Sequence, residues 1–334
     1  MKPGQRTHCA LWLAAAAALV TQSMPCFAQT QPERGTLSAL FENDYFFHTD
    51  RDYTNGVAFA WTSPPIDTPD WPITMARELP FFAGSGEVRT SYALGQNIYT
   101  PSDLALVNPP PTARPYAGWL YLAYGLIEKN DTTLDQLQVQ LGVVGPDSLA
   151  EETQKFVHAV LGDIHPNGWG TQLGNEPAFL IGDERAWRFG GPLFLGFSYD
   201  VDPHLGAVVG TVFDYANAGA MARIGFDLPD DYGPTRIEPA LPGTNFFEPT
   251  ASFGWYLFAG VDGRAIARNL FLDGNTWQES RHVEKIPLVG DLQFGVAMSW
   301  EQWRLSFTHV FRSREYTTQV HADQFGAINI SYRY

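Results

Sequence analysis

Two groups of polar residues, far apart in the sequence, could do chemistry together. The first lies in FENDYFFHTDRDYTNG, residues 41–56, where Asn43 and Asp44 end one apolar run and Thr54 begins the next. The hard oxygen atoms of Asn43 and Asp44 suit calcium better than a transition metal. One carboxylate with a few amide or backbone oxygens is an incomplete cage, so water or a substrate would have to complete it. Solvated acids in a hairpin are the alternative explanation.

The second group lies on the clearest helix that the sequence predicts. Ser148 and Glu151 have the spacing of a capping box, and Gly162 is a suitable residue to end the helix. Gln154 and His158 are four residues apart and therefore share a face of that helix. A histidine in such a place could act as a general base. A capped surface helix with a satisfied histidine would explain the same pattern.

Several other kinds of site are excluded or unsupported. None of the eight histidines forms a His-x-x-x-His pair, so the sequence does not support a zinc site. There is no Gly-x-Ser-x-Gly motif, and no serine has a neighbouring histidine that indicates a triad. The formal net charge of −15 excludes a nucleic-acid binder, because phosphate neutralisation requires a basic surface.

The N-terminus predicts export from the cytoplasm. Lys2 and Arg6 precede an apolar run at 10–20 and a small-residue exit at Ala28, which is the layout of a secretory signal peptide. We expect residues 1–28 to be removed and 29–334 to form a single domain. Both cysteines, Cys9 and Cys26, belong to the removed part, which excludes disulfides and cysteine metal sites from the mature chain.

Composition and periodicity predict a membrane β-barrel. Aromatic residues make up 14% of the chain and charged residues only 17%, below the quarter or so that is usual in soluble proteins. No stretch after residue 30 is long and apolar enough for a membrane helix. Large apolar residues alternate with small or polar ones in several segments, for example Leu137, Val139, Leu141 and Val143 with Gln136, Gln138, Gln140 and Gly142. Such alternation is typical of a strand between lipid and lumen, although a soluble β-sandwich shows it too.

The end of the chain distinguishes these two alternatives. The last residues place Ile328, Ile330, Tyr332 and Tyr334 on one face and stop at an aromatic residue. The closing strand of a barrel has this pattern, and its free edge must pair with the first strand. We therefore expect an outer-membrane protein of a Gram-negative cell, surrounded by outer-membrane lipids, whose C-terminal strand ending at Tyr334 engages the barrel-assembly machinery.

The predicted fold is all-β, a twelve-stranded antiparallel transmembrane β-barrel with a short α-helix in an extracellular loop. The expected strands are 36–44, 53–63, 89–99, 116–128, 132–145, 177–189, 194–212, 216–227, 251–267, 284–300, 303–315 and 325–334. The stretches 64–88 and 228–250 are expected as periplasmic connections. Loops that follow odd strands then share the outer rim, which brings loop 45–52 and loop 146–176 to the same side.

Five segments, taken in order, resemble the motifs of the outer-membrane lipid A 3′-O-deacylase family. They are FENDYFFHTDRDYTNG, GQNIYTP (95–101), RPYAGWLY (114–121), LGVVGPDSLAEETQKFVHAVLG (141–162) and GWGTQL (168–173). The resemblance implies a twelve-stranded barrel that hydrolyses an acyl ester of lipid A, in lipopolysaccharide at the outer leaflet, with a calcium ion as cofactor. It also implies that a helix-borne histidine acts as base on water, without an acyl-enzyme.

The resemblance assigns roles to the two polar groups. His158 would be the base, and Gln154 would orient the imidazole or the water. Asp44 and Asn43 would hold calcium, with Asn43 and Thr54 assisting at the developing negative charge. The long first hairpin would then frame the site.

The chain departs from the family pattern at two positions. Residues 102–106 contain no lysine after the Ile-Tyr-x-Pro motif, and Ile164 stands where the family has an acid six residues after the histidine. Asp163 is a neighbouring acid that could replace it, and Arg114 is the nearest cation in sequence. Arg51 and Arg114 are candidate contacts to lipid phosphates, with a structural salt bridge as the alternative for each.

Two other functions are compatible with parts of this pattern. A non-catalytic barrel, either a narrow pore or a structural protein, would explain the strands, the signal peptide and the terminal aromatic residue. It would not explain a Gln-x-x-x-His helix on the same rim as Asn43 and Asp44. An outer-membrane phospholipase with a serine nucleophile lacks a recognisable serine–histidine arrangement in this sequence.

Overall fold

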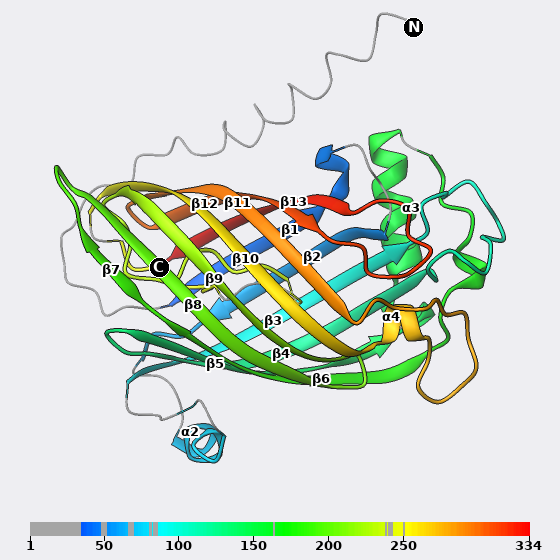
Figure 1. Ribbon diagram of the computed structural model, residues 1–334, viewed down its shortest axis with the longest axis horizontal. Coiled ribbons are helices and arrows are strands. Elements are labelled where there is room, and N and C mark those ends of the chain that lie inside the picture. Colours follow the sequence, from blue (N-terminus) through cyan, green and yellow to red (C-terminus); the bar gives the residue numbers. More distant parts are fainter. Residues whose placement is uncertain are drawn as a thin grey trace, which may run out of the picture. The chain divides into compact units, whose positions relative to one another are not determined.

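The structure is a computed structural model that describes residues 35–47, 52–65, 70–79, 82, 86–162, 164–237, 239, 243–249 and 251–334. The predicted signal peptide, Arg51 and Asp163 lie outside the described residues. An antiparallel sheet closes on itself as a barrel, in which β1 (Thr36–Asn43) pairs with β13 (Asp323–Arg333) along its whole length (Figure 1). This pairing confirms the predicted closure between the first and last strands.

The remaining strands follow one another around the wall. They are β2 (Asp52–Thr62), β3 (Glu87–Thr100), β4 (Ala117–Lys129), β5 (Thr133–Val144), β6 (Glu176–Trp187), β7 (Phe189–Pro192), β8 (Phe197–Gly210), β9 (Phe213–Phe226), β10 (Phe253–Asn269), β11 (Leu288–Trp300) and β12 (Trp303–Arg312). Both β6 and β7 pair with β8 in one register, because Ala186 lies opposite His204 and Phe189 opposite Val201. They are two parts of one barrel strand, so the wall has twelve strands, as predicted.

One predicted strand, 194–212, begins too early. Leu195 and Gly196 have φ angles of 52° and 81°, so they form a turn between β7 and β8 rather than extended chain. Glycine adopts this left-handed backbone without strain, which explains why the chain reverses at that point.

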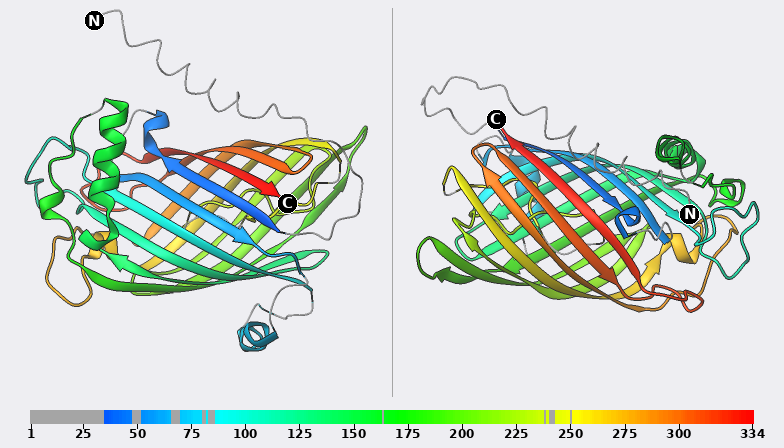
Figure 2. Two further views of the ribbon diagram at one scale, coloured as in Figure 1. Left: turned by 180° about the vertical axis from the view of Figure 1, so that it is seen from behind. Right: turned by 90° about the horizontal axis from the view of Figure 1, so that it is seen from above.

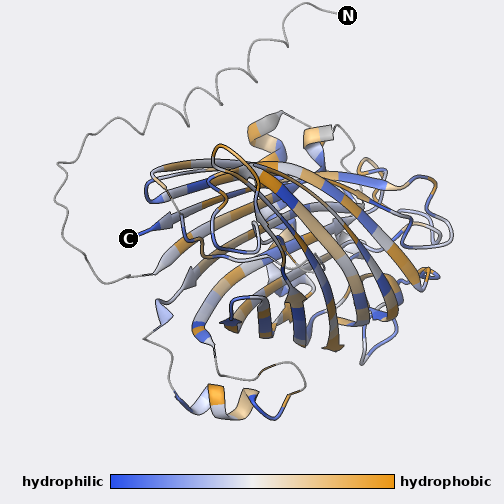
Figure 3. Cartoon of the chain, turned by 60° about the vertical axis from the view of Figure 1, so that its left-hand side comes forward, coloured by the Kyte–Doolittle hydropathy of each residue, from blue (hydrophilic) through white to orange (hydrophobic). Residues whose placement is uncertain are grey.

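The two faces of the wall differ as the alternation predicts. Leu292 and Phe294 of β11 are 47% and 45% exposed on the outside, whereas Gln293 between them is 2% exposed and faces the lumen. In β5 the outward Leu141 is 60% exposed and the inward Gln140 only 4%. Figure 3 shows the resulting alternation of hydrophilic and hydrophobic positions along the strands. The outer face is therefore suited to lipid and the lumen to polar groups.

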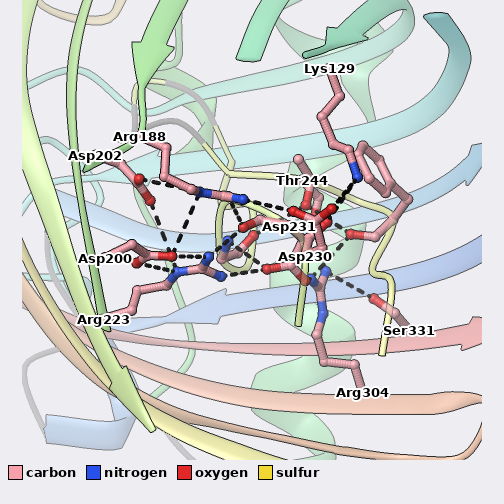
Figure 4. A network of polar contacts seen from close by, with 12 residues as sticks. Lys129, Arg188, Asp200, Asp202, Arg223, Asp230, Asp231, Thr244, Arg304 and Ser331 are labelled. Carbon is pink, nitrogen blue, oxygen red and sulfur yellow. Dashed lines mark hydrogen bonds and ion pairs between the residues drawn. The ribbon is translucent and has the colours of Figure 1, made fainter. Parts of the chain in front are cut away.

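The connection between β9 and β10 occupies the lumen. We call its described residues 229–237, 239 and 243–248 the plug. Asp231 of the plug accepts a hydrogen bond from Arg304 at 2.8 Å and also pairs with Arg223 (Figure 4). Farther along, the Nε of Arg236 donates to Glu42 of β1 at 3.1 Å. The stretch links two neighbouring strands, as predicted, but it folds into the lumen, where its charges neutralise opposite charges inside the wall. That it lies on the periplasmic side stays a prediction.

The other predicted connection, 64–88, packs against the wall. It contains a short helix, α2 (Asp70–Ala76). Ala76 and Phe82 of this connection pack with Val88 of β3 and Leu126 of β4. It therefore covers part of the outer surface of the barrel at the start of β3 and the end of β4.

Five helical segments of the described residues lie at the opposite end, which we call the α3 end (Figures 1 and 2). They are η1 (Asp44–Phe47), η3 (Pro146–Ser148), α3 (Ala150–Leu161), η4 (Trp169–Thr171) and α4 (Leu270–Asp273). The loops after the first and fifth strands thus share one rim, as predicted. No helix in the described ranges is long and apolar enough to cross a membrane.

The start of α3 differs from its prediction. The residue before the helix is Leu149, with a φ of 59° and no side-chain cap, so the predicted capping box of Ser148 and Glu151 is wrong. The Ser148 hydroxyl donates instead to the Gly145 carbonyl at 2.6 Å, inside the preceding η3 turn. The predicted end is confirmed, since Gly162 has a φ of 71° and donates its N–H to the His158 carbonyl.

The ion pairs of the plug predict a large difference between two adjacent acids. Asp231→Asn leaves the buried guanidinium groups of Arg223 and Arg304 without their shared carboxylate, which should lower the free energy of unfolding by about 3–5 kcal/mol. Asp230→Asn is the matched control, because the Asp230 side chain is 56% exposed in its pairs with Lys129 and Arg188. Its effect should stay within about 1 kcal/mol. Urea unfolding of the barrel in detergent measures both, and equal effects would contradict the role given to Asp231.

Candidate active site

The first group of predicted site residues lies on the outer face of the wall. Along β1 the outward Leu37 and Phe41 are 49% and 37% exposed, whereas the inward Glu42 binds Arg236 of the plug. Because side chains alternate along a strand, Asn43 faces outward, two residues beyond Phe41. The site therefore begins on the lipid-facing side of the barrel and not in the lumen.

A turn at the end of β1 carries Asp44 away from the strand. The N–H of Tyr45 donates to the Asn43 side-chain oxygen at 2.7 Å, which is the hydrogen bond of an Asx turn. The following residue, Phe46, covers Gly326 of β13, where a Cβ atom would lie 2.7 Å from the Phe46 ring. The absence of a side chain at Gly326 thus lets η1 fold over the outer face, and Asp44 is left only 2% exposed.

Thr54 occupies the extra position of a β-bulge. The register between β2 and β3 shifts between Tyr53 and Asn55, so Thr54 has no partner residue of its own on β3. Its hydroxyl shares a hydrogen bond of 2.6 Å with the hydroxyl of Thr100. Bulges re-aim side chains in this way beside functional sites.

The helix α3 docks on the same outer face. Gly118 of β4 lies four residues before Leu122, which is 65% exposed to the outside. A Cβ atom at Gly118 would come within 2.2 Å of both the Ala150 Cβ and the Ser148 hydroxyl. Gln96 of β3 also donates to the Ser148 carbonyl at 2.6 Å. Glycine at this point therefore allows the helix to approach the wall closely.

Trp169 determines how the amide of Gln154 is turned. Its indole N–H donates to the Gln154 side-chain oxygen at 2.7 Å. Trp169 itself is 1% exposed and packs against Tyr116, with ring centres 5.0 Å apart. The amide nitrogen of Gln154 is buried and finds no acceptor among the described residues. A buried donor without an acceptor is costly, so this nitrogen is suited to a bound oxygen atom.

His158 is held through one of its ring nitrogens. Its Nδ1 lies 2.6 Å from the backbone carbonyl oxygen of Ile164. A carbonyl can only accept, so Nδ1 carries the proton in the neutral ring and the lone pair is on Nε2. This is the tautomer that a general base requires at Nε2.

The structure brings the two predicted groups to one side of the rim. Figures 1 and 2 show η1 and α3 beside each other at the α3 end. All five side chains are buried, with exposed fractions between 2% and 8%, for Asn43, Asp44, Thr54, Gln154 and His158. Together they offer a base, an amide donor and several oxygen ligands.

The donor set fits calcium and not a transition metal. Asp44, Asn43 and Thr54 present oxygen atoms only, which is the preference of calcium. No group of three or more His, Cys, Asp or Glu side chains that could hold a metal exists in the part of the chain that the structure describes. The Asn43 oxygen already accepts one hydrogen bond and keeps a second lone pair. Water or substrate oxygens are therefore needed to complete a calcium site here.

Arg114, a candidate phosphate contact, is placed differently. It is 1% exposed, and its Nη1 lies 3.3 Å from a carboxylate oxygen of Glu315. Its guanidinium also lies 4.9 Å from the ring centre of Tyr99. This placement favours the structural salt bridge, which was the alternative for this residue. The other candidate, Arg51, lies outside the described residues.

Two features of the site were not predicted from the sequence. Trp169 lies in the GWGTQL motif, but no spacing rule connects it with Gln154. The carbonyl of Ile164 accepts from His158 where the family pattern led us to look for an acidic side chain. A tryptophan between two glycines after the helix was the one available signal, because a buried indole N–H needs an acceptor.

Solved structures of other outer-membrane proteins are similar to this chain. The structure of LpxR from Salmonella typhimurium matches with a TM-score of 0.73 and 19% sequence identity, over 90% of this chain and 100% of that one. The β domain of the Bordetella autotransporter BrkA matches at 0.40 and 10% identity, over 91% and 99%. No curated protein sequence matches the chain.

A family model also matches the chain over residues 11–334. Its description is outer membrane protein LpxR. The match includes every strand of the barrel and all five site residues. The chain therefore belongs to the LpxR family of outer-membrane β-barrel proteins.

Proposed function

We propose that the protein is a calcium-dependent lipid A 3′-O-deacylase of the outer leaflet, which hydrolyses an acyl ester and so remodels lipopolysaccharide. The observation that carries this proposal is a buried histidine on the lipid-facing side of the wall, held by Ile164 in the tautomer of a base. A lipid ester in the surrounding leaflet can reach such a site without leaving the membrane. Membership of the LpxR family supports the choice of lipid A as substrate.

His158 acts as the base in the proposed reaction. Its Nε2 takes a proton from water as the water oxygen attacks the ester carbonyl carbon. In the second step the carbon–oxygen ester bond breaks, and the proton passes from His158 to the departing sugar oxygen. The products are a fatty acid and a lipid A hydroxyl. No acyl-enzyme is formed.

Gln154 stabilises the negative charge that develops on the carbonyl oxygen. Because its own oxygen is occupied by Trp169, its amide nitrogen is the atom available to donate. A fixed donor aimed at a developing oxyanion is worth roughly 3–4 kcal/mol in the transition state. This role is more specific than orienting the imidazole or the water, which is what the family resemblance led us to expect.

Asp44 and Asn43 would hold the calcium ion, and Thr54 would assist at the developing negative charge. Calcium bound there supplies a Lewis acid that polarises the ester carbonyl. The carboxylate of Asp44 is the only full negative charge among the five site residues, so it should contribute most of the affinity.

The two departures from the family pattern have counterparts in the structure. The Ile164 carbonyl holds His158, which is the task that an acid at this position could perform. The loop 101–116 contains no lysine, but Arg281 from another loop donates to its Pro109 carbonyl at 2.7 Å. A cation therefore lies against this loop, where it could meet an anionic headgroup.

The rival functions find less support. The described residues of the plug occupy part of the lumen that a pore would need, and a cavity of about 120 Å³ lies between Ile237 and Gln140. A structural barrel would leave the buried Gln154 nitrogen and the bulge at Thr54 without a purpose. A serine phospholipase would be revealed by sensitivity to serine-directed inhibitors.

Replacing His158 tests the reaction itself. His158→Ala should reduce deacylation by about 10²- to 10⁴-fold, because it removes the general base. Mass spectrometry of lipid A from expressing cells should show loss of the 3′ acyl or acyloxyacyl mass with the wild type only. His165→Ala is the matched control, since His165 is exposed in the same loop. Full activity of a folded His158→Ala variant would contradict the assignment.

Replacing Gln154 tests the oxyanion donor. Gln154→Met keeps the length of the side chain but removes the donor, so kcat should fall about 10²- to 10³-fold with little change in KM. Trp169→Phe frees the amide to rotate and should cause a smaller fall in kcat. An unchanged kcat in Gln154→Met, with normal folding, would show that another group stabilises the charge.

Removing calcium or its main ligand tests the metal. A chelator should abolish turnover, and calcium should restore it. Asp44→Asn should raise the calcium concentration for half-maximal activity roughly tenfold or more, since even outer-shell partners have effects of that size. Asp147 is an exposed acid at the same end, so Asp147→Asn should leave this calcium concentration unchanged. Activity that is indifferent to the chelator would remove calcium from the mechanism.

A further inference from the structure

The exposed surface of α3 is divided lengthwise into an apolar and a charged flank. Leu149, Phe156 and Val160 are 54%, 69% and 61% exposed, and their spacing of seven and four residues puts them along one side. Glu151 and Lys155 form an ion pair one turn apart on the other side. Between the two flanks lies the buried stripe that carries Gln154 and His158.

The apolar flank continues a surface that already faces lipid. The helix docks on the outside of β3 and β4, against Gly118. On the same strands, Leu94 and Leu122 are 48% and 65% exposed on the outer face of the wall. Figure 2 shows α3 on the outside of the barrel at its rim. An amphipathic helix in this place has lipid beneath it and water above it.

Leu149 provides a second, independent observation. It holds a φ of 59°, a left-handed conformation that is strained for leucine and that glycine adopts freely. Its side chain is more than half exposed, so packing against the protein does not compensate for the strain. The strained turn thus presents a large apolar side chain to the surroundings at the start of the apolar flank.

We propose that α3 is an interfacial helix whose flank of Leu149, Phe156 and Val160 inserts among the acyl chains of the surrounding leaflet. The flank of Glu151 and Lys155 then faces the aqueous phase. Insertion fixes the depth of the helix in the membrane and therefore the depth of Gln154 and His158. This depth, at the boundary between headgroups and acyl chains, is where the ester bonds of a membrane lipid lie. The proposal rests on the outer-membrane barrel and not on the proposed reaction.

Single labelled cysteines can locate the two flanks. The full chain with Cys9→Ser and Cys26→Ser has no other cysteine, so a new thiol can be labelled alone. Phe156→Cys and Val160→Cys probe the apolar flank, and Lys155→Cys is the matched control on the charged flank. Each variant carries an environment-sensitive fluorophore and is inserted into phosphatidylethanolamine–phosphatidylglycerol vesicles. All three positions are exposed or partly exposed on the helix surface, so the substitutions should leave the fold intact.

Two quenchers, aqueous iodide and spin-labelled lipids, show whether a labelled residue is surrounded by water, by lipid or by protein. At residues 156 and 160 we expect blue-shifted emission, several-fold weaker quenching by aqueous iodide than at 155, and strong quenching by spin-labelled lipids. Equal iodide quenching on both flanks would overturn the proposal. Shielding at 156 and 160 from iodide and from the spin-labelled lipids would also overturn it, because a second protein copy would then cover the flank. Neither outcome depends on whether the protein deacylates lipid A.

Discussion

The pairing of β1 with both β2 and β13 is the constraint on which the rest of the structure depends. In a membrane no water is available to bond a free strand edge, so the sheet must close. β1 has one face towards lipid and one towards the lumen, and its last two residues therefore meet different surroundings. Glu42 faces inward and binds the plug, whereas Asn43 faces outward and begins the candidate site. The end of β1 thus takes part in closing the barrel, in binding the plug and in forming the candidate site.

Ion pairs in the lumen hold the end of β1 in place. Inward charges are acceptable only when they are paired, because an unpaired buried charge is strongly unfavourable. Asp231 of the plug pairs with Arg223 and Arg304 of the wall. Arg236 of the plug pairs with Glu42 of β1. The plug therefore connects β9 and β12 with β1 through side chains instead of backbone. The wall behind the site is supported from within, which suits a site whose parts come from separate loops.

The sequence predicted what depends on local pattern and missed what depends on distant partners. Period two in β5 and β11 and the terminal Tyr334 were enough for the barrel and its closure. The plug was missed because a stretch rich in Pro, Asp and Gly looks the same whether it faces water or a polar lumen, and Asp231 meets Arg304 across 73 residues. The capping box failed because Ser148 lies inside the preceding η3 turn, so that Leu149 and not Ser148 is the residue before the helix. At the site, the sequence indicated the types of the functional residues. It did not indicate the groups that orient them, Trp169 and the Ile164 carbonyl, because these contacts depend on tertiary packing.

A site on the outside of the wall has a physical reason. A lipid ester lies at the membrane boundary, and moving its acyl chains into a polar lumen would expose them to water and charge. For the proposed reaction, building the site outward leaves the acyl chains in the leaflet, and the ester has only to reach Gln154 and His158 at the outer face of the wall. The wall then has to provide small residues where other segments approach, as Gly118 does beneath α3 and Gly326 beneath Phe46. These two glycines let η1 and α3 lie flat against the barrel on either side of Asn43 and Thr54. The geometry of the site is therefore set by which outward positions of the wall lack a side chain.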